Sequence, residues 1–329
     1  MERVVPLRTA PRLSDAVRFV AFGILIHLTL LAGAEQLVWR TGHMNPIFRI
    51  ERAETDLDWV ILGASHAMPL SYDGFEAEME AATGLRLLNL AAPGAGPLYN
   101  RFALEHFLER RKACAILYVV DSFAFRSPQW NEERFGDPKL LARTPLRAAV
   151  AGRLASYVMR EGVDRRVLAD YLLGFSRLND RERFRRDVFE GEAQFDRVFR
   201  PSSTAEHRRA DYLYPAVADE RGARERYLAT LGALVAAARM KGSTVVLARF
   251  PLPARFAALL PDEAGFDFRL RRFAADHALG LLDFSRVLEG AEYYADTDHL
   301  NRAGVRALFD RNLQPVLERQ RCAQPFVEG

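Results

Sequence analysis

The chain has 329 residues, of which 49% are hydrophobic and 27% charged, and its formal net charge is +3. A chain of this length and composition is able to bury a large core, which excludes wholesale disorder. Its weak positive charge comes mainly from arginines interleaved with acids, which does not indicate a nucleic-acid-binding protein. The two cysteines, Cys114 and Cys322, are expected to be independent thiols, and no cysteine–histidine cluster or phosphate loop indicates a metal or cofactor.

The first 40 residues have the pattern of a membrane anchor. Basic residues come first: Arg3, Arg8, Arg12 and Arg18. A charge-free stretch follows at 19–34 and resumes as Leu37–Trp39, giving the roughly 20 residues that a spanning helix needs, with Trp39 and Arg40 at the far interface. The basic side predicts a single-pass inner-membrane protein whose remainder is exported to the periplasm. Ala32-Gly-Ala34 also fits a signal-peptide cleavage site, so a cleaved signal stays open.

After a polar connector at 41–57, apolar runs typical of buried strands alternate with helical patterns. The expected strands are 59–62, 85–90, 113–120, 243–248 and 279–284. The expected helices are the later part of 68–82, then 98–112, 218–241, 268–277 and 301–320. This alternation predicts one α/β domain at 58–320, with a five-stranded, parallel, doubly wound sheet of the flavodoxin-like type, followed by a tail at 321–329.

The alternation stops between residues 122 and 217. Helical patterns rich in arginine occupy 145–161, 164–176 and 180–189, while the aromatic residues near 123–130 are expected in a loop. A block this long is not an ordinary connection, so we expect a helical insertion that lies over the carboxyl edge of the sheet, controls substrate access and adds little to the core. Its arginines face either solvent or an anionic polymer, solvent being the commoner case: Arg165, Arg166, Arg181, Arg183, Arg185 and Arg186.

Ser65 follows the first strand in the sequence Gly63-Ala-Ser65-His-Ala67. It is therefore expected at the carboxyl edge of the sheet, where ligands bind in open α/β folds. The N-terminus of the next helix would supply N–H groups for a developing negative charge. The alternative is that Ser65 only caps that helix.

A second polar segment, Asp296-Thr-Asp298-His299, lies between the fifth strand and the last helix. A serine nucleophile needs a base to accept its proton and a carboxylate to orient that base. His299 and Asp296 are able to fill these roles from one loop. Asp298 is a competing carboxylate, although Asp298 and Asn301 are also candidates to cap the last helix.

These segments resemble the blocks of the SGNH (GDSL-like) hydrolase superfamily. Gly63-Ala-Ser65 resembles the nucleophile block in its envelope-protein form, and Asn89-Leu-Ala-Ala-Pro-Gly94 resembles the second block. The segment 296–299 resembles the final Asp-x-x-His block. The resemblance covers about 58–121 and 218–320. It implies a catalytic Ser65, His299 and Asp296, with the N–H groups of Ser65 and Gly94 as the oxyanion hole.

One block departs from the family pattern. The third strand should be followed by an asparagine that donates to the oxyanion, but here it continues as Asp121-Ser-Phe, and the next asparagine is Asn131. Either the insertion supplies another donor, with Asn131 as a candidate, or the oxyanion hole is weaker.

The resemblance implies an exported, membrane-tethered O-acetyltransferase or acetylesterase that acts on envelope or exopolysaccharide glycan through an acyl-serine intermediate. Its partners would be that glycan and, as acyl donor, a membrane-bound O-acyltransferase; no cofactor, metal or nucleic acid is expected. The alternative is a non-catalytic glycan-binding or assembly protein of the envelope that uses the same fold. A simple secreted esterase or lipase is a third interpretation.

Overall fold

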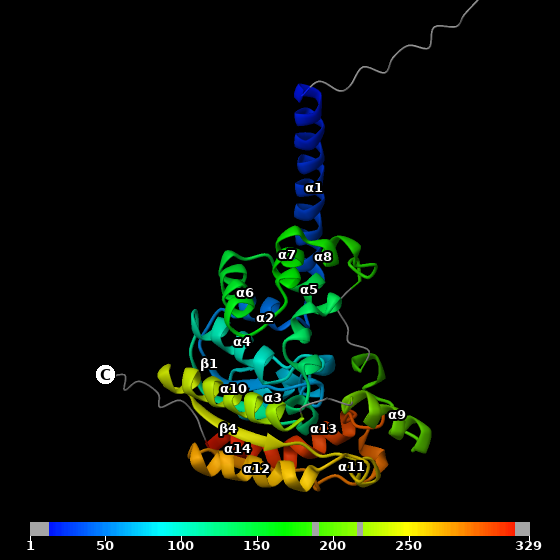
Figure 1. Ribbon diagram of the computed structural model, residues 1–329. Helices are drawn as coiled ribbons and strands as arrows, with labels where there is room; N and C mark the ends of the chain where they lie inside the picture. Colours follow the sequence, from blue (N-terminus) through cyan, green and yellow to red (C-terminus); the bar gives the residue numbers. More distant parts are fainter. Residues whose placement is uncertain (1–12, 186–190, 216–219, 320–329) are drawn as a thin grey trace, which may run out of the picture.

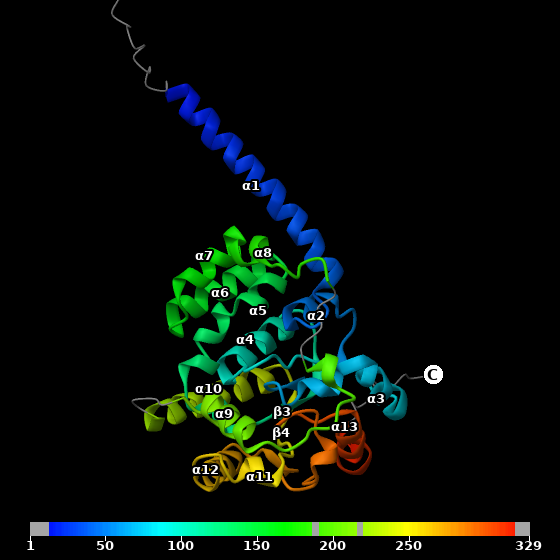
Figure 2. The same ribbon diagram turned by 90° about the vertical axis from the view of Figure 1, so that its right-hand side faces the viewer.

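A computed structural model describes residues 13–185, 191–215 and 220–319 of the chain. A parallel sheet lies between layers of helices, and one long helix, α1 (Leu13–Thr41), projects from this domain (Figures 1 and 2). Some features of the sequence lie outside the described residues: Arg3, Arg8, Arg12, Arg186, Cys322 and the tail at 321–329.

The sheet has five parallel strands in the order β2-β1-β3-β4-β5, which confirms the predicted fold class. The strands are β1 (Leu57–Leu62), β2 (Leu87–Asn89), β3 (Ala113–Val119), β4 (Thr244–Arg249) and β5 (Gly280–Asp283). Because all strands run in the same direction, the segments that follow them meet at one edge of the sheet. This carboxyl edge is where Ser65 and the 296–299 loop were expected.

Both faces of the sheet are buried, and alternate side chains of β1 pack on opposite sides. Val60 and Leu62 join a core with α4 (Pro97–Leu108), α10 (Glu220–Met240) and α12 (Glu263–Asp276). Trp59 and Ile61 belong to the opposite core, with α3 (Phe75–Thr83), α13 (Arg302–Leu308) and α14 (Gln314–Arg319). Burial on both faces explains why β3 and β4 appear in the sequence as nearly unbroken apolar runs, whereas the edge strand β5 is only partly buried.

Several elements differ from their expected limits. α12 begins at Glu263 rather than at 268, and the helix expected at 301–320 is divided into α13 and α14 by a π-helical turn over Phe309–Leu313. The connector at 41–57 contains a further helix, α2 (Pro46–Arg52). The Asn45 side chain caps α2 by accepting hydrogen bonds from the backbone N–H groups of the second and third helical residues.

The insertion between β3 and β4 is largely helical. Its helices are α5 (Pro138–Arg143), α6 (Ala148–Arg160), α7 (Arg165–Leu173), α8 (Phe175–Asn179) and α9 (Ser203–Leu213). The helix expected at 180–189 is absent over 180–185, where the chain forms turns. The aromatic segment expected in a loop forms buried 3₁₀ turns at Ser122–Phe125 and Pro128–Trp130. Residues 122–140, Gly191, Gln194 and α9 reach the carboxyl edge, whereas α6 packs on α4 and α8 packs on α1.

The prediction that the insertion adds little to the core is wrong. Phe135 and Tyr157 belong to the same buried cluster as Val60 of β1 and Phe102 of α4. Each of the two rings meets Phe102 edge-on, with ring centroids 5.2 Å apart. The insertion therefore covers the outer side of α4 and completes the core on that face of the sheet.

The two parts of α1 lie in different environments. The large apolar side chains between Phe19 and Leu30 are exposed, and by length and composition α1 is able to cross a membrane, a test that a secretion signal near the N-terminus also passes. From Leu31 onward the helix packs on the domain, and the Trp39 ring lies 5.4 Å from that of Phe48 in α2. Trp39 is therefore packed within the domain rather than lying free at a membrane interface.

Cys114 in β3 is disulfide-bonded, so the expectation that it is an independent thiol is wrong. Its place at the start of an apolar strand suggested an independent thiol, because sequence spacing alone does not show whether a cysteine is bonded. A disulfide is typical of proteins in oxidising compartments.

If the insertion is part of the α/β core, Phe135→Ala should destabilise the whole domain. Removing a buried aromatic ring typically lowers the free energy of unfolding by about 3–5 kcal/mol. We expect a single, cooperative urea transition at lower denaturant concentration, with sheet and insertion unfolding together. A variant in which only the insertion unfolds early would show that it is an autonomous unit.

Candidate active site

Ser65 lies on a sharp turn directly after β1. Gly63 has φ +152°, and a Cβ at this position would lie 3.0 Å from both the Cβ and the carbonyl oxygen of Val119 in β3, so the turn requires glycine. The N–H of Gly63 donates to Asn100 Oδ1 in α4 at 2.9 Å. The following helix is a 3₁₀ segment, Met68–Gly74, whose N-cap is Ala67, and α3 is capped by Gly74. Ser65 therefore caps neither helix.

The structure brings Ser65, His299 and Asp296 into one chain of hydrogen bonds. Ser65 Oγ lies 2.8 Å from His299 Nε2, and His299 Nδ1 lies 2.8 Å from Asp296 Oδ2. With the Nδ1–H donating to the carboxylate, Nε2 is free to accept the serine proton, which is the tautomer that nucleophile activation requires.

The loop that carries Asp296 and His299 is held by its own backbone. Asp296 Oδ1 accepts the N–H groups of Asp298 at 3.0 Å and His299 at 2.8 Å, which fixes the carboxylate beside the imidazole. The N–H of Ala295 donates to the carbonyl of His299 at 2.9 Å. Asn301, one of the two cap candidates, is the N-cap of α13 and accepts the N–H of Gly304.

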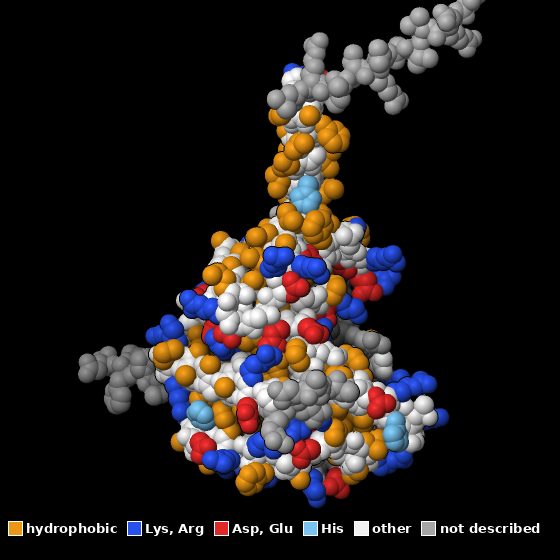
Figure 3. Space-filling view, viewed as in Figure 1, with side chains coloured by type: hydrophobic (Ala, Val, Ile, Leu, Met, Phe, Trp, Pro, Cys, Tyr) orange, Lys and Arg blue, Asp and Glu red, His pale blue; other side chains and the backbone are white. Residues whose placement is uncertain are grey.

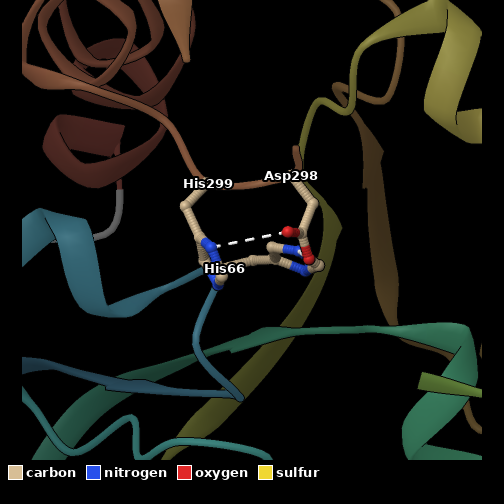
Figure 4. A group of neighbouring side chains, drawn as sticks. All are labelled: His66, Asp298 and His299. Atoms are coloured by element: carbon tan, nitrogen blue, oxygen red, sulfur yellow. Dashed lines mark hydrogen bonds and ion pairs between the residues drawn. The ribbon is translucent and has the colours of Figure 1, made fainter. Parts of the chain in front are cut away.

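Asp298, the other candidate, does not cap a helix. Its buried carboxylate accepts hydrogen bonds from Arg209 of α9 at 2.8–3.0 Å and lies 3.0 Å from His66 Nε2. The His66 Nδ1 lies 2.6 Å from Asp121 Oδ1, at the position where the family pattern has asparagine. Figure 4 shows His66 meeting Asp298 and His299 from a separate segment. At 3.5 Å from His299 Nδ1, Asp298 is the more distant of the two carboxylates.

Charge compensation sets the protonation of this network. Burial alone would lower the pKa of His66, but the carboxylates of Asp121 and Asp298 outweigh it and raise the pKa to about 10. Burial would raise the pKa of Asp298, but His299, Arg209 and His66 hold it well below its usual range. At neutral pH the network is therefore ionic, with His66 and Arg209 cationic beside two carboxylates.

His66, Asp298 and His299 each present a possible metal-ligand atom within 4.8 Å of the others. Arg209 Nη2 lies 2.8 Å from Asp298 Oδ2 and 3.4 Å from His299 Nε2, which places a positive charge among the three. The His66 nitrogens already face two carboxylates. This donor set favours an ion-pair network over a cation site.

Ser65 and His299 open into a pocket of about 510 Å³. Gly94 lines the pocket, and among the described residues the backbone N–H groups of Ser65 and Gly94 donate to no protein acceptor. Gly94 has φ +61°, and a Cβ there would lie 2.6 Å from the Trp130 ring and 3.0 Å from Arg134 Nη1. The insertion therefore places a guanidinium group beside this candidate oxyanion donor.

Asn131 does not line the pocket. Its buried carboxamide donates to the carbonyls of Ala124 and Ser127 and accepts the N–H of Leu98 at the start of α4. The hypothesis that Asn131 replaces the missing oxyanion donor is therefore wrong. It fixes the entry into α4 and the adjoining turn.

Sequence reasoning missed His66, Asp121, Arg134 and Arg209 as members of the site. His66 and Asp121 could have been predicted from the sequence, because each follows a parallel strand and must therefore lie at the carboxyl edge. Arg209 and Arg134 come from the insertion, where no periodic pattern indicates which arginine faces inward.

No family model matches the chain, and the comparison with curated proteins gave no match. Among solved structures, the chain is similar to a "putative acylhydrolase" from Bacteroides fragilis, with TM-score 0.42 and 8% identity over 83% of this chain and 94% of that one. It is also similar to a GDSL-like lipase from Bacteroides thetaiotaomicron, with TM-score 0.40 and 6% identity over 79% and 87% of the two chains. Likeness at this level concerns the fold alone, and function has to be argued from the site.

Substitution of the two aspartates of the loop by asparagine should have different effects, one on turnover and the other on stability. Asp296→Asn removes the carboxylate that orients His299, so esterase kcat should fall by about 10³–10⁴-fold with little change in melting temperature. Asp298→Asn removes a buried charge that Arg209 and His66 both need, and should lower the free energy of unfolding by about 3 kcal/mol or more. If Asp298→Asn leaves the stability unchanged while abolishing turnover, Asp298 is the orienting carboxylate.

The charge on His66 should appear in the pH dependence of stability. Because the folded-state pKa is raised from 6.5 to about 10, the stabilisation by protonated His66 is fully present below pH 6.5 and is lost as pH rises toward 10. The difference in unfolding free energy between wild type and His66→Gln should therefore shrink across this window in urea titrations. A constant difference would show that His66 is neutral in the folded protein.

Proposed function

We propose that the chain is an exported, membrane-tethered serine enzyme that transfers or hydrolyses acyl esters. The observation that carries this proposal is the hydrogen-bonded series Ser65–His299–Asp296, whose members line the pocket. Three residues from two distant segments adopt the geometry that activates a serine hydroxyl.

The residues support a two-step reaction. Ser65 Oγ attacks the acyl carbonyl while its proton passes to His299 Nε2, and the N–H groups of Ser65 and Gly94 hold the oxyanion. In comparable sites each such donor is worth about 3 kcal/mol. His299 then protonates the departing alcohol oxygen, leaving an acyl-serine. Water or an acceptor hydroxyl then attacks that ester while His299 accepts its proton, and His299 returns the proton to Ser65 Oγ as the bond between the acyl group and the serine breaks.

The envelope setting is the finer part of the proposal. The apolar exposed part of α1 suits an inner-membrane anchor, and the disulfide at Cys114 suits the oxidising, periplasmic side. An envelope or exopolysaccharide glycan as acceptor, and a membrane-bound O-acyltransferase as acyl donor, are expectations from the resemblance.

A fluorophosphonate ester should label the purified full-length protein at Ser65, because only an activated serine attacks phosphorus readily. Ser65→Ala should lose the label and reduce hydrolysis of a small acetyl ester by at least about 10³-fold, without a change in melting temperature. Ser71→Ala, nearby on the 3₁₀ segment, is the matched control and should keep both.

The non-catalytic alternative predicts the opposite result. If the chain is a glycan-binding or assembly protein, the fluorophosphonate should not label the wild type. Ser65→Ala should then leave any hydrolysis of the acetyl ester unchanged. Either result would overturn the proposed enzyme.

A further inference from the structure

The exposed part of α1 is short for a membrane span. The charge-free stretch from Phe19 to Ala34 is about 24 Å long at 1.5 Å per residue, against a hydrocarbon core of about 30 Å. Only the part up to Leu30 projects clear of the domain, because Leu31 and Ala34 are buried. If α1 crosses the bilayer, the domain must therefore lie directly against it.

The lower part of α1 is fixed in the domain rather than hinged. Glu35 accepts hydrogen bonds from Trp39 Nε1 at 2.8 Å and from the N–H of Leu146 at 3.0 Å, and lies 3.3 Å from Arg177 Nη1 of α8. These contacts set the direction in which the membrane-facing helix leaves the domain. The contacts of Glu35 with Leu146 and Arg177 also join α1 to the insertion.

The corner between α7 and α8 lies beside the start of the exposed helix. Gly174, between these helices, approaches Leu31 so closely that a Cβ on Gly174 would overlap Leu31 Cδ1. On either side of this contact, Leu172, Leu173 and Phe175 are 48%, 45% and 53% exposed. Figure 3 shows apolar side chains gathered where α1 enters the domain, with basic side chains just beneath them.

We propose that Leu172, Leu173 and Phe175, which we term the α7–α8 corner, insert into the interface of the bilayer that α1 crosses. This rests on the proposed membrane tether but not on the esterase chemistry. The corner supplies the apolar surface that the short helix lacks, while Arg165 and Arg166 on the same helix α7 are exposed and suited to lipid phosphates. The bilayer is the surface that the corner contacts, because the corner lies beside the membrane-spanning helix. Leu31, which lies against Gly174 between α7 and α8, belongs to the same charge-free stretch as the exposed part of α1.

The corner gives the active site a fixed orientation. A single helix with a flexible connector would let the domain rotate above the membrane, but α1 continues into the fold and the corner adds a second point of contact. The pocket is therefore held facing one direction relative to the bilayer.

The test places tryptophan on the corner of the full-length protein in vesicles of phosphatidylethanolamine and phosphatidylglycerol. In Phe175→Trp, the added emission should shift to shorter wavelength and be lost when brominated phospholipid replaces part of the lipid. Leu172→Trp repeats the measurement at a second position. The matched control is Phe268→Trp, a residue that is 68% exposed on α12, the helix at the end of the domain away from α1 (Figure 1). It should show neither effect beyond wild type.

Flotation of the protein with the same vesicles tests the membrane tether separately from the contact of the corner with the bilayer. If the chain floats with the vesicles but neither corner variant is quenched, the tether stands and the corner proposal is overturned. If the chain does not float, both are overturned. A blue shift that appears only in native membranes, without quenching in lipid vesicles, would show that a protein partner covers the corner and would also overturn the proposal.

Discussion

The Asp298 carboxylate is buried where four segments of the chain meet. His66 comes from the nucleophile turn, Arg209 from the insertion, and Asp121, through His66, from the end of β3. Neighbouring charges keep Asp298 ionised despite its burial, so each segment is held by the charge of another. The position of Ser65 relative to His299 depends on this network, because it joins the turn that carries the serine to the loop that carries the histidine.

Besides covering α4, the insertion supplies side chains to this network and to the pocket. Arg209 contacts Asp298 and lies 3.4 Å from His299 Nε2, while Trp130 and Arg134 border Gly94. One wall of the pocket is thus built by residues outside the alternating α/β segments. A fold of this kind supplies the edge on which a serine and a histidine meet, and the insertion supplies the local shape and charge.

The same insertion joins the site to the proposed membrane surface. Aromatic side chains such as Phe135 and Tyr157 connect it to α4 and the sheet, and Arg177 connects it to Glu35 of α1. Close-packed interiors resist continuous deformation, so the anchor, the insertion and the sheet are expected to behave as one body. From Leu31 onward, α1 packs on the domain together with α2 of the connector.

Local patterns were sufficient to predict the five parallel strands, the long α10 helix, and the placement of Ser65, Asp296 and His299 at one edge. Apolar runs identify buried strands, and parallel order brings their carboxyl ends together whatever the details of packing. The structure alone decided that Asp298 is a buried network residue, that Asn131 supports α4, and that the insertion belongs to the core. These roles depend on which side chains from distant segments are buried together. Sequence spacing carries no record of that, because burial and charge pairing are set only when the chain is packed.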